Sequence, residues 1–314
     1  MFEAIATALP FDWYNPLRAG AVRLRRGSLP RSACVAVLQI AHRAWRHRLA
    51  ERVDDVRPLD APHLSFAPTN SMVVDALYWF GVRGYEGKVA DVWVELCRDA
   101  GAVLEIGGNI GLFTTLGRRA CRGTYTVVEP VPQIAAVLRG NLARNALEGV
   151  EVLEAAVIPQ GPARDVVLNI PDEGRAAPVG AHLVEGVEVI GRSTLKAITV
   201  RGLPAAELMA GRDLIKIDAE GIEAELLAAA REVILATRPT LMVEVLPEAV
   251  MLGRMLAELA QAAGYSISVI PEYGRDDIVT VAPEAFDSTV PRRWNSKDVV
   301  LSVRPPPKGL RGTF

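Results

Sequence analysis

From about residue 99 onward, the sequence alternates short apolar runs with longer segments of helical periodicity. Strands separated by helices require a parallel sheet that is covered by helices on both faces. No helical pattern separates the last two apolar runs, so we predict that the final strand pairs antiparallel. The expected fold is a doubly wound α/β domain with a mostly parallel, seven-stranded sheet. The predicted strands cover residues 102–106, 124–129, 150–157, 213–218, 240–246, 265–270 and 298–303.

Two regions depart from this alternation. Residues 158–200 carry two extra predicted strands around a loop that contains Gly and Pro, and we expect this insertion to lie over the carboxyl edge of the sheet, where open α/β folds bind ligands. The first 98 residues predict a helical extension ahead of a main domain at 99–314. Within the extension, residues 31–52 have an apolar side and an Arg/His side. Such a helix packs on the main domain or lies on a membrane surface.

The composition narrows the classes of protein. Half of the residues are hydrophobic, which is enough for a sizeable core, and the formal net charge of −2 gives no general attraction to nucleic acid. We expect no membrane span and no signal peptide, because neither a long apolar run nor a basic leader is present. The cysteines Cys34, Cys97 and Cys121 have neither metal-ligand nor disulfide spacing, so we expect a cytoplasmic protein. The pattern does not indicate an oligomeric state.

The segment from Glu105 to Gly111 (EIGGNIG) follows a predicted strand and precedes a predicted helix. The glycines Gly107, Gly108 and Gly111 let the backbone turn sharply and approach a ligand without interference from side chains. Glu129 ends the next predicted strand, where a carboxylate can accept hydrogen bonds from both ribose hydroxyls. The sequence therefore predicts a nucleoside-containing cofactor at the carboxyl end of the 102–106 strand.

Two cofactors fit this geometry, S-adenosylmethionine (SAM) and NAD. The turn lacks the G-x-G-x-x-G spacing of a dinucleotide site, and the acidic Glu105 suits the ammonium group of SAM better than a diphosphate. We therefore favour SAM; a glycine-rich turn without a ligand is the structural alternative. Glu105 and Asn109 are expected to hold the methionine end, and Glu129 the ribose. Ala156, in the third predicted strand, is a further candidate cofactor-binding residue.

A second informative segment begins at Leu214, where Lys216 and Asp218 fall on one face of a predicted central strand. A central parallel strand is expected to be apolar on both faces, so the Lys216 charge requires a partner. Lys216 is either part of the catalytic machinery or an ion-pair partner of Asp218 or Glu244. Asp218 is our first candidate for the general base, and a helix cap is its alternative role.

Three further side chains near this edge are candidates. His182, in the inserted loop, is the second choice for the base, although a loop histidine is usually only solvated. Oxygen atoms of Asp218, Glu220 and Glu244 at adjacent strand ends suit Mg²⁺, which gives a metal-assisted variant. Glu220 and Glu223 also fit the first turn of the following helix, where carboxylates interact favourably with the helix dipole.

The quoted segments resemble the FkbM family of SAM-dependent methyltransferases. The resemblance rests on LEIGGNIGLFT, VVEP at 127–130, the helix with Asn141 and Asn145, and LIKIDAEGIEAELL at 214–227. It covers roughly residues 70–304, including Tyr85-Glu86 upstream of the glycine turn. Glu105 and Gly108 stand where the family usually has Asp and Ala. The resemblance implies a Rossmann-like fold and O-methylation of hydroxyls on natural products, sugars or glycans.

Three functional hypotheses follow. The first is a SAM-dependent O-methyltransferase acting on a small-molecule or sugar acceptor, by in-line displacement at the methyl carbon. The second is a SAM-binding protein without catalysis that recognises a partner. The third is an NAD-linked oxidoreductase. Binding of SAM against NAD separates the third hypothesis from the others, and turnover separates the first from the second.

Overall fold

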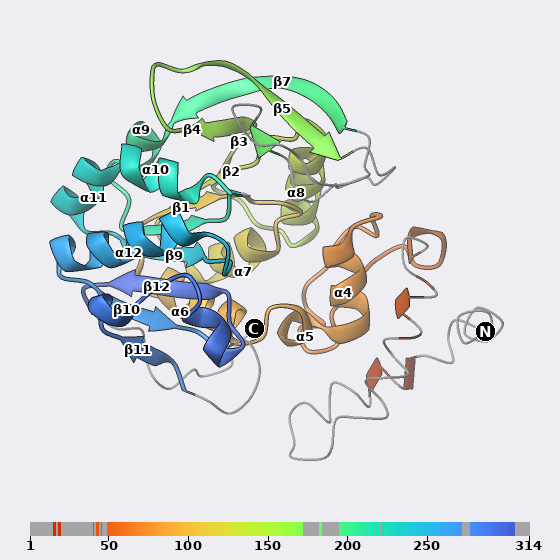
Figure 1. Ribbon diagram of the computed structural model, residues 1–314. Coiled ribbons are helices and arrows are strands. Elements are labelled where there is room, and N and C mark those ends of the chain that lie inside the picture. Colours follow the sequence, from red (N-terminus) through yellow and green to blue (C-terminus); the bar gives the residue numbers. More distant parts are fainter. Residues whose placement is uncertain are drawn as a thin grey trace.

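The computed structural model describes residues 15–16, 18–19, 40, 42–43, 45, 49–171, 182–183, 195–219, 221–271 and 277–304. From residue 102 onward, strands and helices alternate as the sequence predicts (Figure 1). The predicted strands of the central sheet appear as β1 (Ala102–Ile106), β2 (Thr124–Val128), β3 (Val150–Leu153), β8 (Leu214–Ile217), β9 (Thr240–Glu244), β10 (Ser266–Val269) and β12 (Asp298–Ser302).

The central sheet has the order β11-β10-β12-β9-β8-β1-β2-β3. The pairs among β3, β2, β1, β8 and β9 are parallel, whereas β12 runs antiparallel to both β9 and β10, which confirms the predicted direction of the last strand. The expected number of seven strands is wrong, because β11 (Val279–Val281) makes an eighth. This edge strand has only three residues and pairs on one side, so its sequence carries little pattern.

The predicted strand 150–157 is also two strands. β3 ends at Leu153, and β4 (Ala155–Ile158) joins a second sheet of order β4-β7-β5-β6 with the inserted strands. The side chain of Glu154, at the break, forms an ion pair with Arg139 of helix α8. A second glutamate, Glu151, lies inside β3, so a charged residue does not by itself mark the break and only the pairing partners identify it. The inserted strands are β5 (Arg164–Pro171), β6 (His182–Leu183) and β7 (Leu195–Pro204).

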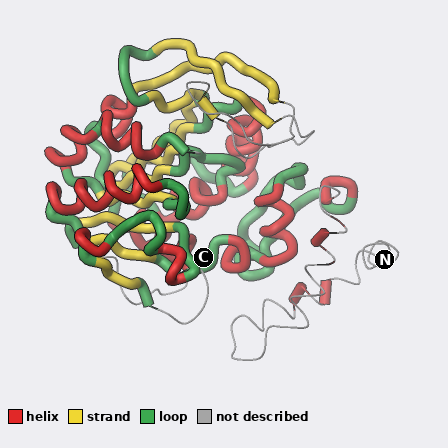
Figure 2. Tube along the Cα trace, viewed as in Figure 1, coloured by secondary structure: helices red, strands yellow, loops and turns green. Residues whose placement is uncertain are grey.

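Helices cover both faces of the central sheet (Figures 1 and 2). The even positions of β1, such as Leu104, pack with the later helices, and the odd positions, such as Val103, pack with the earlier ones. Side chains on both faces are therefore buried, as a doubly wound sheet requires. The earlier helices are α6 (Lys88–Asp99), α7 (Leu112–Ala120) and α8 (Pro132–Arg144), and the later ones are α9 (Ala205–Met209), α10 (Glu223–Ala229), α11 (Arg231–Thr237) and α12 (Val250–Ala263).

The N-terminal part packs on the earlier helices. Helices α4 (Met72–Phe80) and α5 (Val82–Tyr85) contribute to the same hydrophobic cluster as α6 and α7. Short 3-10 helices lie at Leu49–Glu51, Pro283–Ala285 and Pro291–Trp294. The amphipathic segment 31–52 lies mostly outside the described residues. Among the helices that are described, none combines the length and the apolar character that a bilayer crossing needs.

Candidate active site at the carboxyl edge of the sheet

The glycine turn that follows β1 is held by hydrogen bonds to the neighbouring strand. The amides of Gly107 and Gly108 both donate to the carbonyl oxygen of Val128, at 3.0 and 3.1 Å. The amide of Asn109 donates to Glu129 Oε2 at 2.8 Å. The amides of this turn therefore have partners inside the protein. Gly108 and Gly111 are buried, so the turn offers a ligand the partly exposed residues Gly107 and Asn109.

Two of the glycines are required by close packing. Gly107 has a φ of +86°, and a Cβ atom there would lie 2.0 Å from the carbonyl oxygen of Asp218. A Cβ atom on Gly108 would lie 2.4 Å from a methyl carbon of Val127. The absence of side chains therefore lets the turn after β1 lie directly against the turn after β8, which brings the two predicted halves of the site together.

Glu105 is buried beneath this turn and is 1% exposed. The Tyr125 hydroxyl donates a hydrogen bond to Glu105 Oε2 at 2.6 Å. Burial raises the pKa of Glu105 to about 7, although Lys216 and the Tyr125 hydroxyl both act to lower it. Tyr125 was missed by the sequence reasoning. Its position is a usable signal, because Tyr125 lies on the strand next to Glu105 and on the same face of the sheet.

Lys216 lies beside Glu105 in the register of β1 and β8 and pairs with Asp218. Its Nζ is 3.0 Å from Asp218 Oδ2 and 4.6 Å from the centroid of the Phe113 ring. Burial acts to lower the pKa of Lys216, but the charges of Asp218 and Glu105 outweigh it and raise that pKa. The Asp218 side chain is 34% exposed, whereas that of Lys216 is 5% exposed. Asp218 is thus accessible to a ligand while its partner is not.

The same pairing sets the charge of Asp218. Burial acts to raise its pKa, but the ammonium group of Lys216 and the hydrogen bond from it lower the pKa below the ordinary value. Asp218 is therefore a carboxylate at neutral pH.

Glu223, one of the two acids expected in the first turn of the following helix, caps that turn. Its Oε1 accepts hydrogen bonds from the amides of Ala219 and Gly221 at 2.9 and 3.1 Å.

Glu129 lies at the end of β2, against the glycine turn. Its Oε1 accepts a hydrogen bond from the Val131 amide at 3.0 Å, in addition to the bond from Asn109. Burial raises the pKa of Glu129 to about 7, against the effect of these two hydrogen bonds. Each carboxyl oxygen keeps a second lone pair, so two hydroxyl donors can still be accepted.

A second charged pair extends the edge beyond Asp218. Lys297, directly before β12, has its Nζ 2.6 Å from Glu244 Oε1 at the end of β9. The next residue, Asp298, is buried, and its Oδ2 has no hydrogen-bond partner among the described residues. Burial, and then the charge of Glu86, raise the pKa of Asp298 well above its ordinary value. The N-terminal Glu86 therefore lies close to this edge.

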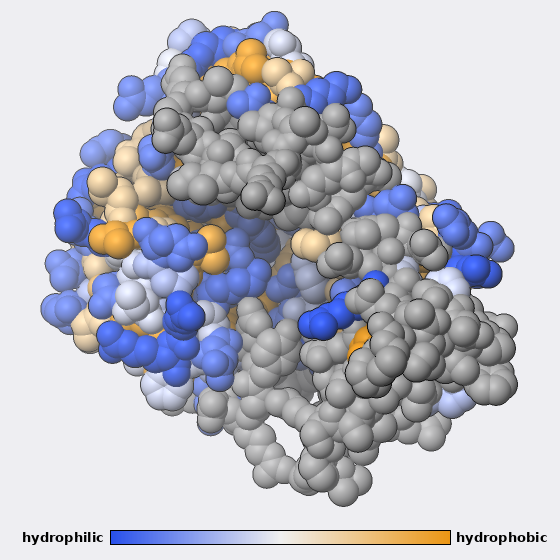
Figure 3. Space-filling model, turned by 45° about the vertical axis from the view of Figure 1, so that its right-hand side comes forward, coloured by the Kyte–Doolittle hydropathy of each residue, from blue (hydrophilic) through white to orange (hydrophobic). Residues whose placement is uncertain are grey.

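Sequence reasoning found Glu244 but gave no role to Lys297 or Asp298. The rarity of lysine was a usable signal, because the chain has only five, at positions 88, 196, 216, 297 and 308. Tyr85 belongs to the same neighbourhood, since the charges of Lys297, Asp218 and Glu244 all act on its phenol. Figure 3 shows a hollow with hydrophilic residues on its floor between the α/β body and the N-terminal helices.

The magnesium variant does not fit these contacts. Asp218 and Glu244 each form an ion pair with a lysine, so their negative charges are already balanced without a metal cation. Across the described part of the chain, no group of three His, Cys, Asp or Glu side chains is arranged to hold a metal ion. Glu220 lies outside the described residues, and so does the side chain of His182, whose backbone pairs with Asn169 in β6 and β5.

Ala156 lies in β4, away from the glycine turn in sequence and in sheet membership. Its side chain packs with Leu168 and Val200 in a small hydrophobic cluster of the second sheet. The neighbouring positions Ala155 and Val157 pack instead into the core of the central sheet. β4 is therefore a shared element, with one face toward each sheet.

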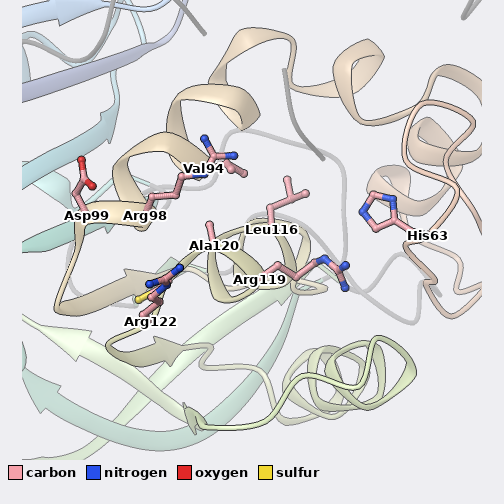
Figure 4. A pocket seen from close by; sticks show the side chains of 9 residues that line it. His63, Val94, Arg98, Asp99, Leu116, Arg119, Ala120 and Arg122 are labelled. Atoms are coloured by element: carbon pink, nitrogen blue, oxygen red, sulfur yellow. The ribbon is translucent and has the colours of Figure 1, made fainter. Parts of the chain in front are cut away.

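A separate pocket of about 640 Å³ lies at the opposite, amino edge of β1 and β2 (Figure 4). Its polar lining includes His63, Arg98, Arg119 and Arg122, where α6 and α7 end. The carbonyl groups at helix C-termini attract cations, which accounts for arginines at this place. The length of α7 separates this pocket from the glycine turn, so it is not part of the candidate site.

The chain matches a model of a known protein family. The family model described as the methyltransferase FkbM domain matches residues 105–267, from Glu105 of the turn into β10. No curated protein matches the chain.

Several solved structures match the chain at low sequence identity. The cofactor-bound protein Rv0187 from MTB shares 18% identity over 69% of this chain and 81% of that one, with a TM-score of 0.34. The methyltransferase FkbM from Methylobacillus flagellatus KT shares 14% identity over 65% of this chain but only 44% of that one, with a TM-score of 0.37. The O-methyltransferase TomG from Streptomyces achromogenes shares 15% identity over 72% and 83%, with a TM-score of 0.35.

Proposed function

The chain belongs to the FkbM family of methyltransferases, and from this we propose that it transfers the methyl group of SAM to a hydroxyl oxygen of an uncharged small molecule or sugar. The observation that carries the proposal is the contact between the two halves of the edge. The glycine turn with Glu129 lies directly against Asp218, so a cofactor on the turn brings its reactive end close to an accessible carboxylate.

The residues of the turn suit SAM. Glu105 and Glu129 are the acidic groups at the turn, and both are poorly solvated, so each gains from a positive or hydroxyl donor. Glu129 would accept the ribose hydroxyls, and Glu105 with Asn109 would hold the methionine end. When bound, SAM supplies the activated methyl group. The Tyr125 hydroxyl holds Glu105 by a hydrogen bond, and the charge of Lys216 favours the ionised form of Glu105.

Asp218 would hold the acceptor hydroxyl and remove its proton. Its carboxylate is ionised at neutral pH and accessible, and its position against Gly107 places it beside the turn. Lys216 would act through Asp218 by fixing its orientation. Positioning of two reactants supplies about 7–11 kcal/mol of a barrier, and a general base about 10²–10⁴-fold in rate, so both tasks matter.

The charges along the edge favour an uncharged acceptor. The two lysines of this edge, Lys216 and Lys297, are each paired with a carboxylate. A phosphate or carboxylate on the acceptor would have to displace one of these partners and would meet Asp218 or Glu244 unpaired. Hydroxyl groups both donate and accept hydrogen bonds, so they can use such pairs without separating them.

Equilibrium binding tests the cofactor assignment. Calorimetry should detect binding of SAM and of S-adenosylhomocysteine, and no comparable binding of NAD. Glu129→Ala should weaken SAM binding by roughly 1–3 kcal/mol through the loss of two charge-assisted hydrogen bonds. Binding of NAD in preference to SAM would instead support the oxidoreductase hypothesis, and unchanged SAM affinity in a folded Glu129→Ala variant would remove Glu129 from the site.

Turnover tests the acceptor assignment. Release of S-adenosylhomocysteine should be measured with a panel of uncharged sugars and natural-product alcohols, each beside its phosphorylated or carboxylated analogue. We expect turnover with uncharged hydroxyl compounds only. SAM binding without turnover on any acceptor would favour the partner-recognition hypothesis, and methylation of an amine or of the charged analogues would contradict the proposed acceptor class.

A further inference from the structure

Asn141 of α8 joins three segments that are far apart in the sequence. Its side chain is completely buried. Its Oδ1 accepts a hydrogen bond from the Ala67 amide at 2.7 Å, and its Nδ2 donates to the carbonyl oxygen of Ile110 at 2.7 Å. One carboxamide therefore connects the N-terminal part of the chain to the glycine turn.

The neighbouring Asn145 provides a second attachment of the same N-terminal segment. Its Oδ1 accepts from the Ser65 amide at 3.0 Å, and its Nδ2 donates to the Ser65 carbonyl oxygen at 2.7 Å. The same Nδ2 also donates to the backbone carbonyl of Asn141 at 2.8 Å. None of these bonds reaches the glycine turn. Both asparagines therefore hold the segment 65–67, but only Asn141 also binds the turn, at Ile110.

The turn that Asn141 contacts has a constrained backbone. Asn109 has a φ of +48°, a conformation that residues other than glycine adopt at a cost. Its side-chain Oδ1 accepts from the Ile110 amide at 2.7 Å, while Asn141 holds the carbonyl of the same residue. Both polar groups of the Ile110 backbone are thus bound by asparagine side chains, one inside the turn and one from α8.

We propose that Asn141 is a positioning residue for the cofactor turn, and that it couples docking of residues 65–67 to SAM binding. Loss of the Ala67 contact frees one end of the carboxamide, which then holds Ile110 less firmly. By thermodynamic linkage, a cofactor that requires the ordered turn must in return stabilise the docked N-terminal segment. This inference rests on the proposed function, because it takes the glycine turn as the SAM site.

Matched variants test the positioning role. Asn141→Ala and Asn145→Ala should both lower the melting temperature, because each removes buried hydrogen bonds. Asn141→Ala should weaken binding of S-adenosylhomocysteine by about tenfold or more in calorimetry at a temperature where it is folded. Asn145→Ala weakens the docking of Ser65 but keeps the Ile110 contact, so its effect on this affinity should be several-fold smaller. Equal affinities in the two variants would reduce Asn141 to a structural role and overturn the proposal.

Hydrogen exchange in the wild-type protein tests the coupling without any substitution. S-adenosylhomocysteine should slow exchange of the Ser65 and Ala67 amides, and this protection should be absent in a folded Asn141→Ala variant. Binding of S-adenosylhomocysteine with no change at these amides would overturn the coupling even if Asn141→Ala does not fold. A wild-type protein that binds neither SAM nor its product would instead contradict the proposed function itself.

Discussion

Lys216 of β8 is the register partner of Glu105 of β1, and the charge of Glu105 acts on its buried ammonium group. Its other partner is Asp218, at 3.0 Å. A buried ammonium group is costly without nearby negative charge, and here the ion pair with Asp218 and the charge of Glu105 both stabilise it. The cofactor side and the acceptor side of the edge are therefore coupled electrostatically through Lys216.

Asp218→Asn should lower turnover by about 10²-fold or more while leaving SAM affinity nearly unchanged. Asparagine keeps the shape but removes the charge and the base. Release of S-adenosylhomocysteine measures turnover. Asp213→Asn is the matched control, since Asp213 lies at the opposite end of the same strand, where it accepts hydrogen bonds from the amides of Gly101 and Ala102 at 2.8 and 2.9 Å. Near wild-type turnover in Asp218→Asn would leave that residue only a structural role.

Lys216→Met should destabilise the protein by up to roughly 3–5 kcal/mol, because it leaves the buried Glu105 and the partly exposed Asp218 without the nearby cation. It should also move the acidic limb of the pH–rate profile to higher pH. Lys216 holds the pKa of Asp218 below its ordinary value, so removal of the ammonium group lets that pKa rise. Denaturant unfolding and kcat measured against pH provide the two readouts. An unshifted acidic limb would mean that Asp218 is not the titrating base.

The pKa values of Glu105 and Glu129, both about 7, predict that SAM binding strengthens as pH rises toward neutrality. A positive ligand prefers the ionised carboxylates, so affinity should increase between about pH 5 and pH 8 and then level off. Calorimetry over this range measures the effect. In Glu105→Gln, SAM affinity should be weaker and its pH dependence smaller; a pH-independent affinity in the wild-type protein would contradict the assignment.

The same raised pKa affects stability without ligand. The folded state binds the Glu105 proton more tightly than the unfolded chain, so this contribution to stability is present below about pH 4.5 and is lost as pH rises through about 7. The glutamine of Glu105→Gln does not titrate, so the variant does not lose this stability as pH rises. The variant should therefore have a flatter melting temperature between about pH 5 and pH 8, and differential scanning calorimetry should show the difference from wild type.

Gly107→Ala should abolish SAM binding or prevent folding. A methyl group there would lie 2.0 Å from the Asp218 carbonyl oxygen, and the φ of +86° is unfavourable for alanine. Gly140→Ala is the control, because Gly140 lies inside α8 with no atom within 4 Å of an added Cβ. This second change should stabilise the protein by about 0.5–1 kcal/mol. Normal SAM affinity in Gly107→Ala would show that the two turns are not in close contact.

Local pattern was sufficient for much of the site. The strand before Gly107, the acidic residue at 129 and the charged face of residues 214–218 are all short-range features, because period-2 alternation and glycine turns act within a few residues. The pairing of Lys216 with Asp218 was one of two partners considered, and the two are neighbours on the same strand face. The direction of the final strand also followed from the missing helix before it.

Other features depended on contacts between distant segments. Residues 150–157 do not by themselves reveal the change of sheet after Leu153, because Glu151 inside β3 is charged like Glu154 at the break and only the pairing partners separate β3 from β4. The same holds for Lys297 beside Glu244, which the antiparallel register of β12 and β9 brings together, and for Asn141, which finds its partners at Ala67 and Ile110.

The sequence by itself therefore determined the strand–turn–helix unit, the doubly wound class and the acids at its carboxyl edge, since each depends on neighbours in the chain. The tertiary structure alone decided the shared ammonium of Lys216, the second pair at Lys297 and the attachment of the N-terminal segment. These depend on strand order and register, which many side-chain contacts set collectively, and a single strand's pattern does not encode which other strand it will meet.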